Sequence, residues 1–180
     1  MSTIRAQLTH VGIYVRDMER MEKFYTEVLG LLITDSGVSP RNNARLTFMS
    51  ADPNIHHQFV LVTGRPDDAQ FSTVNQVSFT VGSLGELREV RDRALAHGAT
   101  GMRVTTHGNA WSIYFMDPEG NTVESYLDTP FHVPQPHGAP FDLDAPDEEI
   151  LRATEAHCRQ DPGFMPYAEW AAGQEVKMAR

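Results

Sequence analysis

We consider four polar residues of this chain as candidate ligands of a divalent metal. His10 and His57 lie in the first part of the 180-residue sequence, and Gln76 and Glu124 lie in the second part. Two imidazoles and one carboxylate make up the set that binds non-haem Fe(II) and leaves coordination positions open for substrate. The four residues can act together only if the elements that carry them fold against one another.

Those elements follow from an internal repeat. Residues 9–30, "THVGIYVRDMERMEKFYTEVLG", align with residues 75–98, "NQVSFTVGSLGELREVRDRALAHG". Each begins with alternating apolar residues, continues with apolar residues three and four positions apart, and stops at a glycine, which predicts a strand followed by a helix. The runs "RLTFMS" and "SIYFMD" each precede an Asp-Pro turn and a further strand. The sequence thus predicts two βαβββ modules, about residues 7–63 and 75–128.

The pleat of the strands assigns the polar residues to faces. In the first strand of each module the apolar residues must meet the helix, so the opposite face carries a polar set: His10, Gly12 and Tyr14, then Gln76, Ser78 and Thr80. His57 and Glu124 have the same spacing as Phe48 and Phe115, so we interpret them as equivalent positions on the last strands. Two modules related by a pseudo-twofold axis would then bring the four polar residues together. His56 would face away, as a solvated or turn residue.

Charge and composition exclude several classes of protein. The net charge of −9 and the absence of a basic cluster argue against binding to nucleic acid. The chain has neither a run of eighteen apolar residues nor a charged-then-apolar leader, so we expect no membrane span and no secretion signal. The single cysteine, Cys158, cannot form an intramolecular disulfide, which fits a cytoplasmic protein.

The character of the sequence changes near residue 130. We expect residues 1–130 to form one domain and residues 131–180 to form an appendage that is not an independent domain. The segment "TPFHVPQPHGAPFDLDAP" carries five prolines, which favours an extended arm. The segment "DEEILRATEAHCRQ" predicts an amphipathic helix with acidic residues in its first turn, followed by a short tail that contains Trp170. The arm and helix could cover the site or pack against a partner subunit.

These features resemble the vicinal oxygen chelate superfamily, which includes glyoxalases, extradiol ring-cleaving dioxygenases, fosfomycin-resistance transferases and bleomycin-binding proteins. The resemblance is carried by "LTHVGIYVRDMERMEKFYTEVLGL" and "SIYFMDPEGNTVESY" and covers residues 7–130. It implies an α+β fold in which paired βαβββ modules form a curled mixed sheet cup that holds a metal, with the helices outside. It also implies a homodimer.

Within the superfamily, the chain is most similar to single-domain extradiol dioxygenases. The histidine pair at 56–57, the spacing of ten residues from Tyr114 to Glu124, and His107 upstream of Tyr114 carry this similarity. It implies that His10 and Glu124 bind Fe(II), that Tyr114 and His107 contact substrate oxygens, and that His57 is the acid/base. The implied substrates are a catecholic aromatic compound and O₂.

The resemblance leaves the remaining metal ligand open. Gln76 stands where the family has its second ligand histidine. Either His57 enters the coordination sphere, or Gln76 coordinates through its amide oxygen, or Asn75 or Gln76 only orients a ligand. A glyoxalase-type lyase or isomerase using Mn, Zn, Ni or Co, and a metal-free protein that binds a drug-like molecule, are the alternative functions. Four further residues would suit a flat aromatic substrate if they lined the cup: Met49, Phe59, Leu61 and Tyr126.

Overall fold

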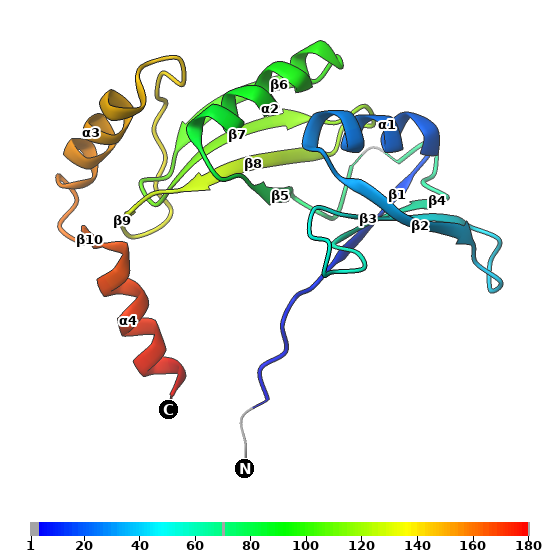
Figure 1. The fold of residues 1–180 in the computed structure, drawn as a ribbon, viewed down its shortest axis with the longest axis horizontal. Helices are drawn as coiled ribbons and strands as arrows, with labels where there is room; N and C mark the ends of the chain where they lie inside the picture. Colours follow the sequence, from blue (N-terminus) through cyan, green and yellow to red (C-terminus); the bar gives the residue numbers. More distant parts are fainter. Residues whose placement is uncertain (1–3, 70, 180) are drawn as a thin grey trace. The chain divides into compact units, whose positions relative to one another are not determined.

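The chain folds into two units, each built from a helix packed on a four-stranded sheet. The computed structural model describes residues 4–69 and 71–179. Unit 1 comprises the chain up to Thr73 together with the turn Asp117–Gly120, and unit 2 comprises Val74–Met116 and the chain from Asn121 onward. Figure 1 labels the helices and strands. The predicted α+β class with two βαβββ modules is confirmed.

Unit 1 has a mixed sheet with α1 on one face (Figure 1). Its elements in chain order are β1 (Val11–Val15), α1 (Met18–Leu29), β2 (Leu32–Val38), β3 (Arg45–Ser50) and β4 (Phe59–Thr63). The strand order is β1-β4-β3-β2, with β1 and β4 parallel and the other neighbours antiparallel. Along β1, Ile13 and Val15 are buried while Gly12 and Tyr14 are exposed, so the predicted alternation is confirmed.

The ends of α1 follow from its capping residues. The Asp17 carboxylate accepts a hydrogen bond from the Arg20 backbone N–H at 3.0 Å, which satisfies one of the free donors of the first turn. Gly30 ends the helix with φ 70°, a left-handed conformation that glycine adopts without steric cost. The buried face consists of Met18, Met21, Phe24, Tyr25 and Val28.

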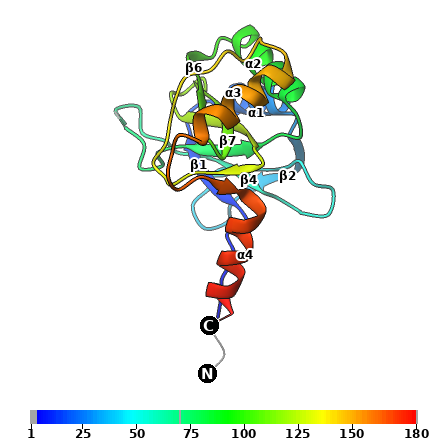
Figure 2. The same cartoon turned by 90° about the vertical axis from the view of Figure 1, so that its left-hand side faces the viewer.

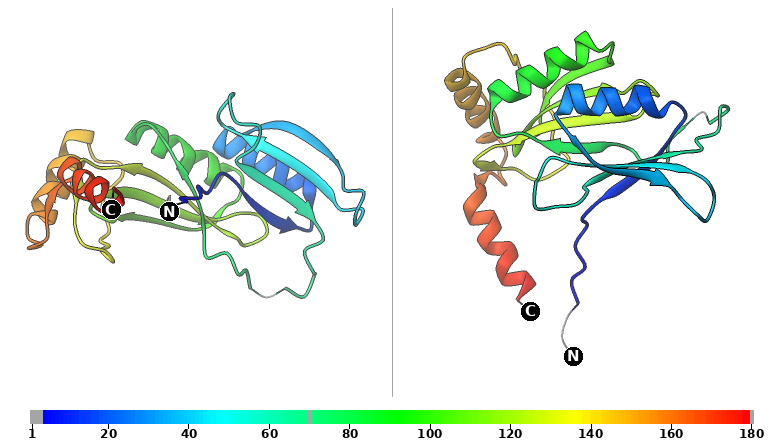
Figure 3. Two further views of the ribbon diagram at one scale, coloured as in Figure 1. Left: turned by 90° about the horizontal axis from the view of Figure 1, so that it is seen from below. Right: turned by 45° about the vertical axis from the view of Figure 1, so that its right-hand side comes forward.

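Unit 2 repeats this arrangement, with α2 along one face of its sheet (Figure 3). Its first elements are β5 (Val77–Thr80), α2 (Leu84–Ala96), β6 (Thr100–Thr106), β7 (Ala110–Met116) and β8 (Thr122–Asp128). The strand order is β5-β8-β7-β6, again with one parallel pair, β5 and β8. The Ser83 hydroxyl caps α2 by accepting from the Glu86 backbone N–H at 3.1 Å.

The C-terminal segment of unit 2 contains two further helices (Figure 2). Its elements are β9 (Phe131–His132), α3 (Asp147–Cys158), β10 (Met165–Pro166) and α4 (Tyr167–Met178). The predicted helix corresponds to α3, whereas α4 replaces the short tail expected around Trp170. No residue of α4 is buried, so this helix does not belong to the hydrophobic core. No helix among the described residues is long and apolar enough to cross a membrane.

The pairing of the strands corrects one predicted equivalence. Glu124 on β8 pairs with Ser78 on β5, and the same register in unit 1 pairs Val60 with Gly12. Val60 is therefore the counterpart of Glu124, and the predicted equivalence of His57 and Glu124 is wrong. The connection from β3 to β4 is longer than that from β7 to β8, which shifts the repeat spacing between the early and late strands. His57 lies in this longer connection, before β4 begins, where strand alternation does not apply.

The apolar residues expected to contact an aromatic substrate belong to the core instead. Met49, Phe59 and Leu61 are almost completely buried. The Phe59 ring packs against the Tyr25 ring of α1, with 4.6 Å between the ring centroids. These positions therefore face the helix rather than the open face of the sheet. The predicted pocket lining is wrong for these three residues.

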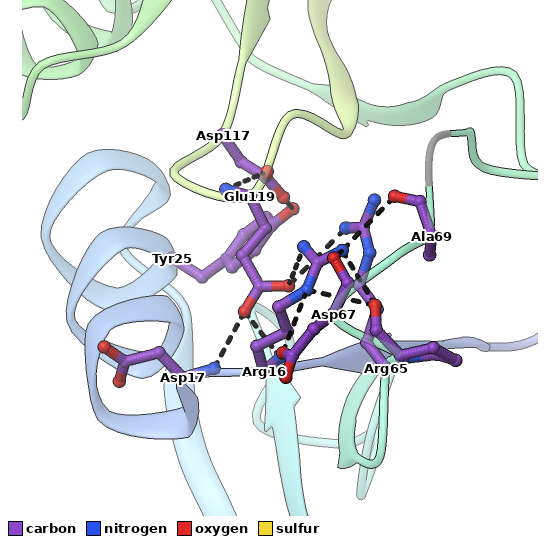
Figure 4. Close-up of polar contacts among 9 residues, drawn as sticks. Arg16, Asp17, Tyr25, Arg65, Asp67, Ala69, Asp117 and Glu119 are labelled. Atoms are coloured by element: carbon purple, nitrogen blue, oxygen red, sulfur yellow. Dashed lines mark hydrogen bonds and ion pairs between the residues drawn. The ribbon is translucent and has the colours of Figure 1, made fainter.

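A buried carboxylate organises the N-terminus of α1 (Figure 4). The Glu119 side chain is 5% exposed and accepts hydrogen bonds from the backbone N–H groups of Arg16 at 2.6 Å and Asp17 at 2.9 Å. The guanidinium groups of Arg16 and Arg65 lie 3.8 and 3.5 Å from it. Because Asp17 caps α1, the Glu119 charge also lies at the positive end of the helix dipole. Glu119 thus satisfies two backbone donors and two cations at once.

We predict that Glu119→Ala lowers the free energy of unfolding by about 3 kcal/mol, because it removes the carboxylate that faces the Arg65 guanidinium, whose side chain is 10% exposed, and that accepts from two backbone N–H groups. Urea denaturation followed by circular dichroism would measure the loss. The matched control is Glu89→Ala, since Glu89 forms an exposed helical ion pair with Arg93, and its loss should change stability by less than about 1 kcal/mol. Equal effects of the two substitutions would contradict this account.

Tyr25 predicts a dependence of stability on pH. Its hydroxyl donates to Asp117 at 3.0 Å, and burial, followed by the charges of Asp117 and Glu119, raises the pKa of Tyr25 well above its usual 10.0. Stability from the neutral phenol is therefore fully present below pH 10 and is lost as the pH rises toward the raised pKa. Between about pH 9 and 11 the wild-type protein should lose more unfolding free energy than Tyr25→Phe. Parallel pH profiles for the two proteins would refute this prediction.

Candidate functional site

Glu124 is the central polar residue of the open face of the unit 2 sheet. It is 7% exposed, and both of its carboxylate oxygens accept hydrogen bonds. The Tyr114 hydroxyl donates to Oε1 at 2.6 Å, and Ser78 and Gln76 donate to Oε2 at 2.6 and 2.7 Å. The strand register produces these contacts, since Glu124 pairs with Ser78 on one side and with Tyr114 on the other.

His107 extends this row of hydrogen bonds. Its Nε2 lies 2.8 Å from the Tyr114 hydroxyl oxygen, and its Nδ1 lies 2.7 Å from the backbone carbonyl of His137. Because a carbonyl only accepts, Nδ1 must carry a hydrogen, and a neutral ring then presents Nε2 as an acceptor. Tyr114 has one hydroxyl proton for both Glu124 and His107. The Tyr114–Glu124 and Tyr114–His107 contacts therefore share one hydroxyl proton. A second proton could bind at His107 Nε2, so the row can take up a proton or transfer one.

Tyr114 is a hydrogen-bond donor over the working pH range. The residue is 8% exposed. Burial, followed by the hydrogen bond to Glu124 and the charge of that carboxylate, raises the pKa of Tyr114 to about 12. The phenol thus stays protonated at neutral pH.

The proline-rich arm holds the loop that carries His107. The Gln135 side chain donates to the His107 carbonyl at 2.8 Å and accepts from the His137 backbone N–H at 3.0 Å. Thr106 and Ala139 exchange two backbone hydrogen bonds of 2.8 and 3.0 Å. The arm, whose role the sequence left open, therefore fixes the orientation of the His107 imidazole.

A cavity of about 410 Å³ opens beside this row. It is lined by Ser78, His107, Asn109, Ala110, Glu124, Tyr126, Asp128 and Gln135. A smaller hollow of about 260 Å³ lies against α3 and includes Phe141, Ile150 and His157. The larger cavity contains Glu124 and His107, whereas the smaller one contains no predicted site residue. We therefore place the candidate site of unit 2 at the larger cavity.

Unit 1 brings together the predicted histidines. The rings of His10 and His57 lie with their centroids 4.5 Å apart, and Nδ1 of His57 is 2.9 Å from Nδ1 of His56. Burial, followed by the nearby His10 and His56, lowers the pKa of His57, which favours a neutral ring with a free lone pair at neutral pH. The His56 side chain is 61% exposed, in keeping with its predicted place in a turn.

The predicted ligand set thus appears as two pairs, His10 with His57 in unit 1 and Gln76 with Glu124 in unit 2. Among the described residues, no group of three or more His, Cys, Asp and Glu side chains is positioned to hold a metal. The chemistry of the donors nevertheless fits a divalent ion, because imidazole nitrogens and carboxylate or amide oxygens suit Fe(II), Mn and Zn. Three hydrogen bonds also leave a carboxylate such as Glu124 a lone pair for a metal.

The prediction from sequence missed several polar residues of this site. Ser78 lies on the predicted polar face but gave no signal of its own, because a serine on a strand is common. Asn109, Asp128 and Gln135 lie in or next to loops, where no periodicity indicates which way a side chain points. The contacts of Gln135 depend on how the arm folds back on unit 2, which local sequence does not specify.

Comparison with known proteins identifies the family. The model of the Glyoxalase/Bleomycin resistance protein/Dioxygenase superfamily matches residues 7–125, and the chain belongs to this superfamily. Among curated proteins, the chain is 25% identical over 167 residues to biphenyl-2,3-diol 1,2-dioxygenase 3 of Rhodococcus globerulus, covering 86% of this chain and 84% of the relative. Biphenyl-2,3-diol 1,2-dioxygenase 2 of the same organism is 25% identical over 130 residues, or 70% of this chain and 65% of the relative.

Solved structures share the fold. A glyoxalase/bleomycin resistance protein/dioxygenase domain from Frankia sp. EAN1pec matches with a TM-score of 0.58 and 21% identity, over 70% of this chain and all of that one. The fosfomycin resistance protein FosX from Listeria monocytogenes, in complex with Mn(II) and sulfate, matches with a TM-score of 0.55 and 20% identity, over 70% of this chain and 95% of that one.

NMR can test whether the contacts of the arm set the tautomer of His107. We predict that Gln135→Ala converts His107 from a single Nδ1–H tautomer to a mixture of tautomers. The substitution removes the hydrogen bonds from Gln135 to the His107 carbonyl and to the His137 backbone N–H, and these bonds hold the His137 carbonyl next to His107 Nδ1. The ¹⁵N chemical shifts of the His107 ring nitrogens report the tautomer directly. Gln160→Ala, an exposed change in the turn that follows α3, is the control and should leave the shifts unchanged. Unchanged His107 shifts in Gln135→Ala would show that the arm does not set the tautomer.

Proposed function

We propose that this protein is an Fe(II)-dependent extradiol-type dioxygenase that cleaves a catecholic aromatic ring with O₂. The observation that carries the proposal is the hydrogen-bonded row of His107, Tyr114 and Glu124 beside a cavity. Such a row supplies a phenol donor and an imidazole to the oxygens of a diol. The similarity to two biphenyl-2,3-diol dioxygenases supports the same substrate class.

The proposed metal ligands are His10, His57 and Glu124, with Gln76 as a fourth ligand or as an orienting partner. Bound Fe(II) would supply Lewis acidity that lowers the pKa of a substrate phenol, together with redox chemistry toward O₂. Gln76 already donates to Glu124, so its orienting role requires no change of its contacts. The lowered pKa of His57 suits either a ligand or a proton acceptor.

The chain's own residues would position the diol and move its protons. The Tyr114 phenol, protonated at neutral pH, can donate a hydrogen bond to a substrate oxygen. The His107 ring is held with Nδ1 on the His137 carbonyl, so its Nε2 is the atom able to accept a proton. His57 would serve as the acid/base for the other phenol group if it does not bind the metal.

We expect protein purified without oxygen and loaded with Fe(II) to form a yellow ring-fission product from catechol or 2,3-dihydroxybiphenyl. Glu124→Ala should lose at least the 10- to 100-fold in metal affinity that an outer-sphere partner contributes, measured as bound iron. Tyr114→Phe should keep the iron and lose about 100-fold in kcat.

Glu148→Ala, an exposed change on α3, is the control and should alter neither the iron content nor the turnover rate. Absence of colour from a panel of catechols with the iron-loaded protein would refute the dioxygenase. Full metal content in Glu124→Ala would refute the ligand assignment.

A glyoxalase-type lyase or isomerase is the second candidate. The observation that favours it is Gln76, whose amide nitrogen donates to Glu124 at 2.7 Å and whose amide oxygen could bind a metal where a dioxygenase would have histidine. Such an enzyme would use Mn, Zn, Ni or Co and move a proton next to a carbonyl. Activity on a hemithioacetal that rises with these metals and not with iron would select this reading. A protein that binds no metal at all would instead favour a small-molecule binding protein.

A further inference from the structure

Asn109 presents an unused hydrogen-bond donor at the cavity beside Glu124. We infer that its side-chain amide binds an uncharged carbonyl group on the substrate, so that the preferred diol carries a ketone, ester or amide substituent. This inference rests on the proposed dioxygenase function and concerns the same cavity. Asn109 is one of the residues that line this cavity, and it is partly exposed. It lies two residues after His107, in the turn that joins β6 to β7.

The contacts of Gln135 fix the orientation of the Asn109 amide. The Gln135 amide nitrogen donates to the His107 carbonyl at 2.8 Å, and its amide oxygen accepts from the His137 backbone N–H at 3.0 Å. The same nitrogen donates to Oδ1 of Asn109 at 3.2 Å. Since an N–H needs an acceptor, Asn109 must turn its oxygen toward Gln135 and its Nδ2 away. Among the described residues, no acceptor contacts this Nδ2.

The turn that carries Asn109 is held in place by its neighbours. Thr129, which is 4% exposed, donates its hydroxyl to the Gly108 carbonyl at 2.6 Å and its backbone N–H to the Asn109 carbonyl at 2.9 Å. Gly108 has φ 75° and lies so close to Val133 and Cys158 that a β-carbon would clash there. The Asn109 backbone is therefore positioned before a ligand binds, and a prepositioned donor loses little conformational entropy on binding.

The other side-chain donors that line the cavity already have partners. The hydroxyl of Ser78 donates to Glu124, and Nδ1 of His107 donates to a backbone carbonyl. The hydroxyl of Tyr126 forms a hydrogen bond with a threonine of β5. Asn109 is thus the side chain whose N–H groups remain for a ligand. A partly buried N–H without an acceptor favours a ligand that brings an oxygen atom to it.

The charges of the cavity select an uncharged acceptor. Glu124 and Asp128 are both among the lining residues, and none of the described lining residues is a lysine or an arginine. A carboxylate substituent would meet two like charges without a counter-charge, which is unfavourable. A second apolar ring, as in the biphenyl diols named for the relatives, would leave the Asn109 amide unpaired. A carbonyl oxygen satisfies the amide and carries no charge.

The experiment compares three diols of nearly equal size: 3,4-dihydroxyphenylacetone, 4-isobutylcatechol and 3,4-dihydroxyphenylacetate. Each has a methylene group between the ring and the variable group, so the carbonyl has little effect on the acidity of the phenols. Calorimetry without oxygen, on the Fe(II)-loaded protein, gives their dissociation constants, and ring fission is measured separately in air. We expect the wild-type protein to bind the ketone about 5- to 10-fold more tightly than the alkyl compound, and the carboxylate most weakly.

Substitution of Asn109 tests the assignment. Asn109→Asp keeps an oxygen that can accept from Gln135 but removes the N–H donors, so it should abolish the preference for the ketone. Asn109→Leu removes the whole amide at similar size and should do the same. Asn42→Asp makes the matched change in the exposed loop between β2 and β3 and should leave the preference intact. If Asn109→Leu does not fold, the wild-type comparison and Asn109→Asp still decide the question.

The outcomes separate the two proposals. A preference for the ketone that depends on Asn109, without ring fission of any diol, would overturn the dioxygenase and support the Asn109 assignment. Equal wild-type affinities for the ketone and the alkyl compound, or an unchanged preference in Asn109→Asp, would overturn the Asn109 assignment even if ring fission occurs. Equal weakening of all three diols in both variants would also overturn it, because a purely structural role has that effect. Failure of all three diols to bind would overturn both proposals.

Discussion

The polar side chains on the open face of unit 2 direct their hydrogen bonds to the buried carboxylate of Glu124. A charge at 7% exposure is costly unless hydrogen bonds replace the water that it loses. Strand pairing supplies these bonds from both sides, Ser78 through the parallel neighbour and Tyr114 through the antiparallel one. The same register that stabilises the carboxylate also places Tyr114 beside it, and the loop before β7 brings His107 to the Tyr114 hydroxyl, so the structural requirement and the proposed chemistry share one set of contacts.

The two modules carry the same fold and have diverged in their polar contents. In unit 2 the open face holds a tyrosine, a carboxylate and a serine on adjacent strands, whereas in unit 1 the position matching Glu124 is Val60. The histidines of unit 1 enter from the segments just before β1 and β4 rather than from the strands themselves. A residue in the segment before a strand can present an imidazole without changing the apolar alternation of that strand. The repeated fold thus offers two different ways of presenting a polar side chain.

The C-terminal arm supplies part of the site by way of the backbone. The carbonyl of His137 and the amide of Gln135 fix His107, and neither contact depends on the apolar patterns that form strands and helices. Prolines around these residues keep the arm out of regular helix and strand, so its carbonyl and N–H groups remain available to neighbours. This explains why a segment with little regular structure can nevertheless orient a candidate catalytic group.

The sequence by itself determined the βαβββ repeat, the two helices that stop at a glycine, the polar faces of β1 and β5, and Glu124 as a candidate, because periodicity and turn residues are local properties. Tyr114 and His107 became candidates through the resemblance to extradiol dioxygenases. Only the tertiary structure decided the register, which removed the equivalence of His57 with Glu124, assigned Phe59 and Leu61 to the core, and placed Tyr114 opposite Glu124. It also decided the contacts of Gln135 and the existence of α4. These depend on loop length and on which segments fold back on one another, and a long-range contact leaves no period in the chain that forms it.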